Sequence, residues 1–156
     1  GIFGCLSIKD NTGISIYNKH LKAGFILDHP TINKIVDDSI KQLSIKTPSM
    51  QQHIENLSGG NQQKVIVSRW LANDPEILIM DEPTRGIDVG AKHEIYEIME
   101  QLADQGKSII MISSEMPELL GMADRVYVMC NGKITGEIDQ KEDMTQEKVM
   151  SFATQF

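Results

Sequence analysis

The sequence has few cysteines and no long apolar segment. Its cysteines, Cys5 and Cys130, are isolated and lack the spacing of metal ligands, which disfavours a zinc site or a disulfide scaffold and favours a reducing compartment. The apolar runs at residues 77–80 and 109–112 are far shorter than the roughly 20 residues that a membrane-spanning helix needs. No amino-terminal signal segment is visible. We therefore expect neither secretion nor a membrane span.

Basic residues are also in deficit. Fifteen Lys and Arg stand against 22 Asp and Glu, a net charge of −7 at pH 7. Because such an acidic surface repels a phosphate backbone, we expect no nucleic-acid partner. Hydrophobic residues make up 40% of the chain and charged residues 24%, and 156 residues suit about one globular domain.

The chain alternates helical and extended patterns after a weakly patterned start. Residues 1–28 predict no element, and apolar residues at helical spacing predict a helix between Pro30 and Thr47. Further on, the pattern predicts helices at 60–72, 89–105, 117–122 and 145–154, and strands at 77–80, 108–113, 125–129 and 133–139. The first two strands are typical of strands buried on both faces. This order predicts an α/β domain with a parallel sheet, in which ligands bind beyond the carboxyl ends of the strands.

Two adjacent carboxylates follow the apolar strand at 77–80. Asp81 could hold Mg²⁺ as a hard oxygen ligand, and Glu82 could polarise a water for attack on a phosphorus atom. An acidic turn in which Pro83 merely ends the strand explains the same residues.

A second polar motif opens the helix at 60–72. Gly59 and Gly60 lack side chains and would let the backbone approach a phosphate closely. The free N–H groups and the helix dipole at this end also favour negative charge. The Ser58 hydroxyl could add one hydrogen bond. An ordinary capped helix start explains this motif equally, and the polar run at 61–64 is typical of a solvated helix face.

Together the two motifs resemble those of ATP-binding-cassette (ABC) ATPases. Leu-Ser-Gly-Gly at 57–60 is similar to the family's signature, and the strand with Asp-Glu-Pro-Thr at 81–84 is similar to its Walker B strand. Asp88 falls at the D-loop aspartate, although Arg-Gly-Ile at 85–87 replaces the usual Ser-Ala-Leu. The stretches 58–64, 81–92 and 113–119 look like the carboxyl-terminal cassette of simple-sugar importers, in which two ATPase halves are fused.

The resemblance implies a P-loop NTPase-like parallel sheet with flanking helices, truncated on the amino-terminal side so that the phosphate-loop strand is absent. Residues 1–57 would be a partial helical subdomain with the segment leading to the signature, and 58–156 the signature helix plus the carboxyl-terminal part of the ATPase core. The strand at 77–80 would then keep an unpaired edge. Gly106-Lys107-Ser108 ends like a phosphate loop, but Gln101 replaces the required glycine and a helix precedes the triplet, so it is interpreted as a connector.

The resemblance also implies ATP and Mg²⁺ sandwiched between two cassettes. ATP on the partner cassette would contact the signature residues Ser58, Gly59, Gly60 and Gln62. The chain's own nucleotide would be served by Asp81 as metal ligand, Glu82 and Ser114 as catalytic residues, and Asp88. Ser114 stands where many members have a histidine; its hydroxyl can bind a phosphate oxygen but cannot act as a cation. We therefore expect this half to act mainly as the activator of a competent site elsewhere.

The function implied is that of the ATP-hydrolysing subunit of a simple-sugar importer, peripheral on the cytoplasmic face of the membrane. Its partners would be a second cassette fused in the same polypeptide, membrane permease subunits and, indirectly, a sugar-binding protein. The isolated fragment is expected to be inactive. Two alternatives stay open: a non-transport ABC ATPase, whose coiled-coil forms would show heptads that are not seen here, and a non-catalytic remnant that only binds a partner.

Overall fold

The computed structural model describes residues 1–154, so the last two residues of the predicted carboxyl-terminal part lie outside the described range. The chain forms two compact units, Gly1–Met111 and Ile112–Phe156. The first unit continues past residue 57 because the helix that follows packs against helices before it. The division at residue 57 refers to the family's architecture and stays a prediction.

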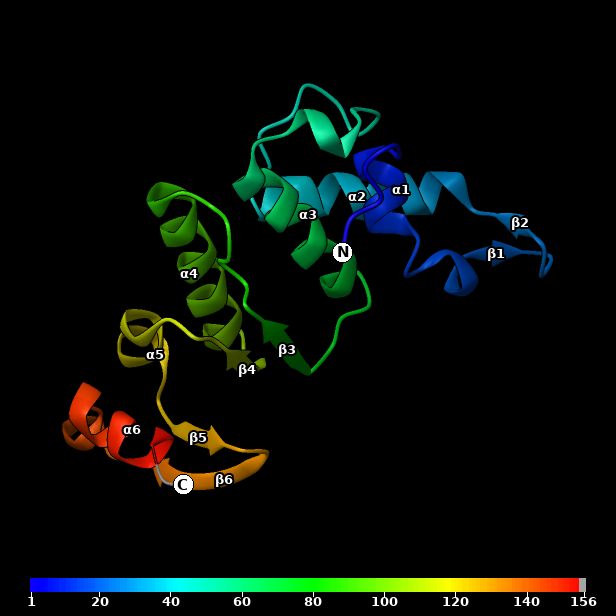
Figure 1. The fold of residues 1–156 in the computed structure, drawn as a ribbon. Coiled ribbons are helices and arrows are strands. Elements are labelled where there is room, and N and C mark those ends of the chain that lie inside the picture. Colours follow the sequence, from blue (N-terminus) through cyan, green and yellow to red (C-terminus); the bar gives the residue numbers. More distant parts are fainter. Residues whose placement is uncertain (155–156) are drawn as a thin grey trace. The chain divides into compact units, whose positions relative to one another are not determined.

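The first unit alternates helices and strands (Figure 1). Residues 1–28, for which no element was predicted, contain the helix α1 (Ile8–Gly13), the 3-10 turn η1 (Tyr17–Lys19) and a small hairpin of β1 (Leu21–Lys22) and β2 (Ile26–Leu27). There follow α2 (His29–Gln42), η2 (Ile54–Asn56), α3 (Gly59–Leu71), β3 (Ile77–Asp81), α4 (Val89–Asp104) and β4 (Ser108–Ile112). The predicted helices and strands of this part are confirmed to within a few residues.

Helix α3 is the centre of the first unit. It packs against α1, α2 and α4. Polar contacts fix α1 to it: the Thr12 and Ser68 hydroxyls lie 2.9 Å apart, and the Arg69 guanidinium donates to the backbone and side-chain oxygens of Asn11. The α1 sequence is short and polar, so an isolated helix of this length would be marginal. The Ser7 side chain caps its start, and these distant partners hold it against α3.

Strands β3 and β4 form a two-stranded sheet joined through α4. The Ser108 N–H donates to the carbonyl of Glu76, so both strands start at the same end and run in the same direction. The predicted burial on both faces is wrong. Leu78 and Met80 are buried, whereas Ile77 is 60% exposed and Ile79 is 69% exposed. The described residues cover one face of β3 only, which produces the alternation.

The second unit is a hairpin with helices. It contains α5 (Met116–Met122), β5 (Val126–Cys130), β6 (Lys133–Ile138), η3 (Lys141–Asp143) and α6 (Gln146–Ala153). The predicted turn at Asn131-Gly132 is confirmed: both residues have positive φ, as a tight two-residue hairpin turn requires. The hydrophobic core of the second unit consists of Val126, Val128, Ile138, Met144 and Val149. In residues 1–154 no helix combines the length and the apolar character needed to span a bilayer.

Candidate functional site

The start of α3 presents the serine and the first glycine to solvent. Ser58 occupies the N-cap position with extended backbone, and it and Gly59 are exposed, whereas Gly60 is buried. The Ser58 side chain makes no capping hydrogen bond to the helix. The first N–H groups of an α-helix lack intrahelical acceptors, so this end of α3 favours an anion.

Gly59 and Gly60 differ in how much space the structure leaves for a side chain. A Cβ added to Gly60 would lie 2.5 Å from the Ala91 Cβ, so this glycine permits the close approach of α3 and α4. A Cβ added to Gly59 would meet the Ile87 side chain at 3.4 Å, an ordinary contact. Packing therefore explains Gly60, and it does not by itself explain Gly59.

The carboxylate pair follows β3 as predicted. Asp81 is exposed at the end of the strand, and Glu82 is half-buried with φ of 47°. That left-handed conformation is strained for any residue with a Cβ. Pro83 and Thr84, which come next, are buried, and the Arg85 N–H donates to the Glu82 carbonyl. The tight turn fixes the backbone of Glu82 at the carboxyl end of the strand.

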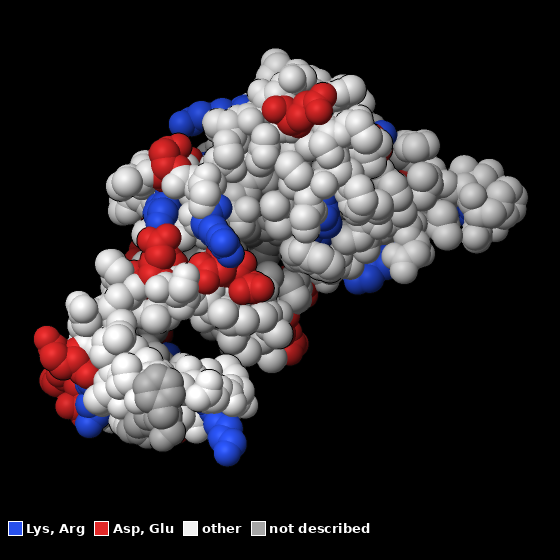
Figure 2. All heavy atoms as spheres, in the orientation of Figure 1, with Lys and Arg blue, Asp and Glu red and all other residues white. Residues whose placement is uncertain are grey.

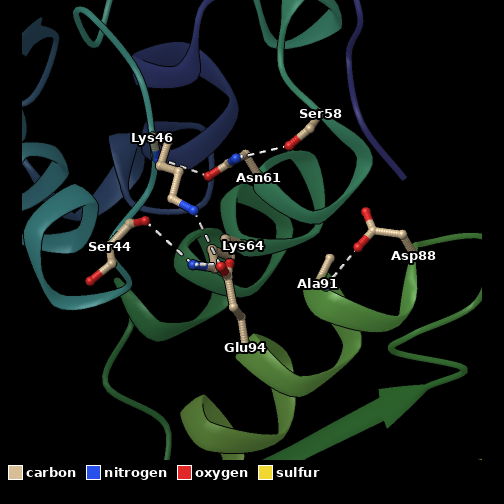
Figure 3. Close-up of polar contacts among 8 residues, drawn as sticks. All are labelled: Ser44, Lys46, Ser58, Asn61, Lys64, Asp88, Ala91 and Glu94. Atoms are coloured by element: carbon tan, nitrogen blue, oxygen red, sulfur yellow. Dashed lines mark hydrogen bonds and ion pairs between the residues drawn. The ribbon is translucent and has the colours of Figure 1, made fainter.

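Asp88 has a structural role that the sequence prediction did not include. Its Oδ1 accepts a hydrogen bond of 2.9 Å from the Ala91 N–H and caps α4 (Figure 3). Because Ala91 is also the residue that Gly60 touches, the start of α4 is fixed by Asp88 and faces the start of α3.

The polar run at 61–64 does not form a solvated face, so that interpretation is wrong for Asn61 and Lys64. Asn61 is 9% exposed and Lys64 is 3% exposed. Lys64 Nζ lies 2.9 Å from Glu94 Oε2 on α4 and donates to the Ser44 carbonyl at 3.3 Å (Figure 3). Polar residues on α3 thus join it to α4 and to the loop after α2.

Glu94 is shared by two cations. Lys46 Nζ lies 3.3 Å from its other carboxylate oxygen. Hydrogen bonds from Lys64 and then Lys46 lower the pKa of Glu94 below its ordinary value. Over α4, acidic and basic side chains are interspersed on the visible surface (Figure 2).

The two remaining residues of the predicted site are Gln62 and Ser114. Gln62 donates through Nε2 to the Leu57 carbonyl at 3.0 Å, within its own motif. Ser114 is exposed in the turn between β4 and α5 and belongs to the second unit, so its role at a nucleotide stays a prediction. The triplet at 106–108 joins α4 to β4, and Lys107 is bound to Asp74, which agrees with a connector.

Asp81 fits a magnesium ion that arrives with phosphate. No group of three or more potential His, Cys, Asp or Glu ligands occurs in the described part of the chain. Mg²⁺ usually takes one or two carboxylates and completes its octahedron with substrate phosphates and water. A single exposed carboxylate after β3 is therefore compatible with Mg²⁺ bound together with a nucleotide, and it does not form a cage of its own.

Solved structures define the class to which this fold belongs. A nucleotide-free ATP-binding cassette from an ABC transporter aligns with a TM-score of 0.80 at 23% identity, over 95% of this chain and 60% of that chain. A dimeric ATP-binding cassette in a post-hydrolysis state, bound to ADP and Pi, aligns with a TM-score of 0.74 at 21% identity, over 88% and 58%. The fold is that of part of an ATP-binding cassette, which confirms the predicted α/β fold class.

The sequence profile described as ABC transporter matches residues 3–85, more than half of the chain. The chain belongs to the ABC transporter family, as the motifs at 57–60 and 81–84 predicted.

Several relatives indicate which members of the family this chain is similar to in sequence. The galactose/methyl galactoside import ATP-binding protein of Clostridium tetani is 55% identical over 100% of this chain and 31% of its own length. The arabinose import ATP-binding protein of Paraburkholderia xenovorans is 53% identical over 98% of this chain and 30% of its own length. The ribose import ATP-binding protein of Clostridium tetani is 49% identical over 100% and 31%. The chain spans about a third of the length of these relatives.

Sequence reasoning missed Asn61, Lys64 and Glu94 as parts of the site's framework. The position of Lys64 on its helix could have indicated that it is buried. It follows Asn61 by three residues, so both lie on one side of the helix, and it precedes the buried Val65 and Val67. Nothing local identified Glu94 and Ser44 as its partners.

Proposed function

We propose that this chain is part of the ATP-hydrolysing subunit of a simple-sugar importer. The observation that carries the proposal is that α3 exposes Ser58 and Gly59 at its start, while β3 ends on Asp81 and a strained Glu82. The relatives named as import ATP-binding proteins for galactose, arabinose and ribose support sugars as the transported class.

The two motifs serve different nucleotides in this proposal. Ser58, Gly59, Gly60 and Gln62 contact ATP held by a second cassette, fused in the same polypeptide. Asp81, Glu82, Asp88 and Ser114 serve ATP on this half. The dimeric cassette bound to ADP and Pi supports a two-cassette arrangement.

At this half's own site, Glu82 accepts a proton from the attacking water. The water oxygen bonds to the terminal phosphorus, and the bond from phosphorus to the ADP oxygen breaks. Asp81 holds Mg²⁺, which when bound neutralises charge on the phosphates. Ser114 donates a hydrogen bond to a phosphate oxygen and, lacking charge, stabilises it less than a protonated histidine would. Hydrolysis here is therefore weak, and the exposed signature activates the partner's site.

The whole subunit would lie peripherally on the cytoplasmic face of the membrane. There ATP hydrolysis would drive permease subunits between inward- and outward-facing states, and a sugar-binding protein would deliver the sugar to the permease. The isolated chain is expected to be inactive, because a site needs both cassettes.

A hybrid protein tests the assignment. In it, this chain replaces the matching segment of the Clostridium tetani galactose/methyl galactoside import ATP-binding protein. Ser58→Arg should lower ATP turnover at least about tenfold, because it puts bulk and charge where the other cassette's ATP is activated. Glu82→Gln should lower turnover less. Ser151→Arg, exposed on α6, is the matched control and should leave turnover unchanged.

The outcomes separate the alternatives. Loss of turnover in Glu82→Gln together with normal turnover in Ser58→Arg would show that the two roles are assigned wrongly. A hybrid that binds its partner subunits but whose turnover neither change affects would favour the non-catalytic remnant.

A further inference from the structure

The side-chain amide of Asn61 has only one orientation that satisfies its partners. Its Oδ1 lies 2.8 Å from the backbone nitrogen of Lys46, and its Nδ2 lies 2.9 Å from Ser58 Oγ (Figure 3). A backbone N–H can only donate, so the amide oxygen must face Lys46. The amide NH₂ therefore faces Ser58.

This orientation decides what the Ser58 hydroxyl can do. The hydroxyl accepts a hydrogen bond from Asn61, so its single proton is not used in that contact. Ser58 makes no cap to α3, and it donates to no acceptor among residues 1–154. The exposed hydroxyl is thus kept as a hydrogen-bond donor toward an acceptor outside the chain.

We propose that Asn61 is a positioning residue that keeps Ser58 a donor to an anionic phosphate oxygen of the nucleotide on the opposing cassette. The inference rests on the proposed function, because it presumes that Ser58 faces that nucleotide. Asn61 itself is buried, so its role is exerted through Ser58.

The partner of Asn61 is itself held in place. The Ser44 carbonyl, two residues before Lys46, accepts from Lys64 on α3, and the Lys46 ammonium pairs with Glu94 on α4. The backbone N–H that orients the amide is therefore anchored to α3, whose start carries the signature motif, and to α4. The direction of the Ser58 proton follows from this anchored loop.

Asn61→Asp tests the proposal in the hybrid protein, since it is almost isosteric. A carboxylate still accepts from the Lys46 N–H, but its second oxygen can be satisfied only if Ser58 donates to it. The outward proton is then lost. We expect kcat to fall roughly tenfold with little change in KM or in the thermal midpoint, because the fold keeps its bond to Lys46.

A double-mutant cycle with Ser58→Ala separates this role from simple charge repulsion. If Asn61 acts through Ser58, the double variant has the turnover of Ser58→Ala alone; additive losses overturn the proposal. Asn56→Asp adds the same charge at an exposed position two residues before Ser58 and should leave turnover unchanged; an equal loss there also overturns it.

Failure of the proposed function gives a different result. If Ser58→Ala leaves turnover unchanged, Ser58 does not face the nucleotide and the functional assignment falls. If Ser58→Ala lowers turnover and Asn61→Asp does not, only the positioning role of Asn61 falls.

Discussion

Glu82 has an unfavourable backbone conformation at the position proposed for the catalytic carboxylate. Its φ of 47° is in the left-handed region, and the buried Pro83 and Thr84 that follow fix the turn. Such strain persists where the surrounding structure determines the backbone, and it is frequent at functional sites. Glycine would suit the backbone better, but it has no carboxylate.

Two variants of Glu82 should separate the strain from the chemistry. Glu82→Gly and Glu82→Ala both remove the carboxylate, and only the alanine variant keeps a Cβ at positive φ. We expect the glycine variant to be more stable by about 1 kcal/mol, measured by urea unfolding of the hybrid, and both to lose hydrolysis at this half's own site. Equal stabilities would show that the turn stores no strain.

The polar residues of α3 show how far single positions could be predicted. The position of Ser58 at the start of a helix followed from the sequence, because a serine before the first helical residues is a local signal. The burial of Asn61 and Lys64 did not follow. Their partners, Lys46, Ser44 and Glu94, come from segments that only the fold brings to α3.

Between elements, the approach of α3 to α4 depends on a glycine. The spacing of apolar residues predicted both helices, and the apolar residues Ile95, Ile98, Met99 and Leu102 of α4 are buried. The distance between the helices is set where Gly60 faces Ala91.

Adding one methyl group to each glycine should therefore have different effects. Gly60→Ala places a Cβ 2.5 Å from that of Ala91 and should cost about 1–3 kcal/mol of stability in thermal or urea unfolding. Gly59→Ala meets only an ordinary contact and should change stability by less than about 0.5 kcal/mol, while it lowers ATP turnover of the hybrid. Equal stability of the two variants would contradict the close approach of the helices.

The ion pair between α3 and α4 makes a second prediction at this scale. Glu94→Gln leaves the buried Lys64 ammonium without its anion, so it should cost about 1–2 kcal/mol, reduced because the Glu94 side chain is 38% exposed. Glu97→Gln, which removes an exposed carboxylate on the same helix, is the matched control and should cost less than about 0.5 kcal/mol.

The pH dependence of that difference has a defined sign. Lys64 and Lys46 hold the pKa of Glu94 below its ordinary value of 4.5. The stabilisation is therefore fully present above that value and is lost as the pH falls through the lower folded-state pKa. The gap in unfolding free energy between the original protein and Glu94→Gln should be constant near neutrality and narrow in acid; a gap that widens in acid would contradict the pair.

At the scale of the whole molecule, an apolar surface on β3 stays uncovered by the described residues. The outward side chains of β3 form part of an open groove of about 850 Å³, which Phe3 and Trp70 also line. Parallel strands are normally covered on both faces. Exposed apolar surface of this kind promotes association.

We expect the isolated chain to self-associate at micromolar concentration through this face. Ile79→Lys should reduce association, measured by sedimentation velocity, and should change its stability little because Ile79 is 69% exposed. In the hybrid, where further chain is present to cover the sheet, the same change should cost about 2 kcal/mol. Phe25→Lys, at another exposed apolar residue, is the control. A monomeric chain at high concentration would contradict the expectation.

The sequence by itself determined the helices and strands after residue 28, the tight hairpin turn and the two motifs that identify the family. These features depend on the period of apolar residues and on turn residues within a few positions of each other, so no distant partner is needed to recognise them.

Only the tertiary structure decided which polar side chains are buried, which glycine separates the helices and which face of β3 is covered. It also decided that α1 packs against α3. Each of these depends on groups far apart in the chain, whose hydrogen bonds and contacts exist only after the backbone has folded.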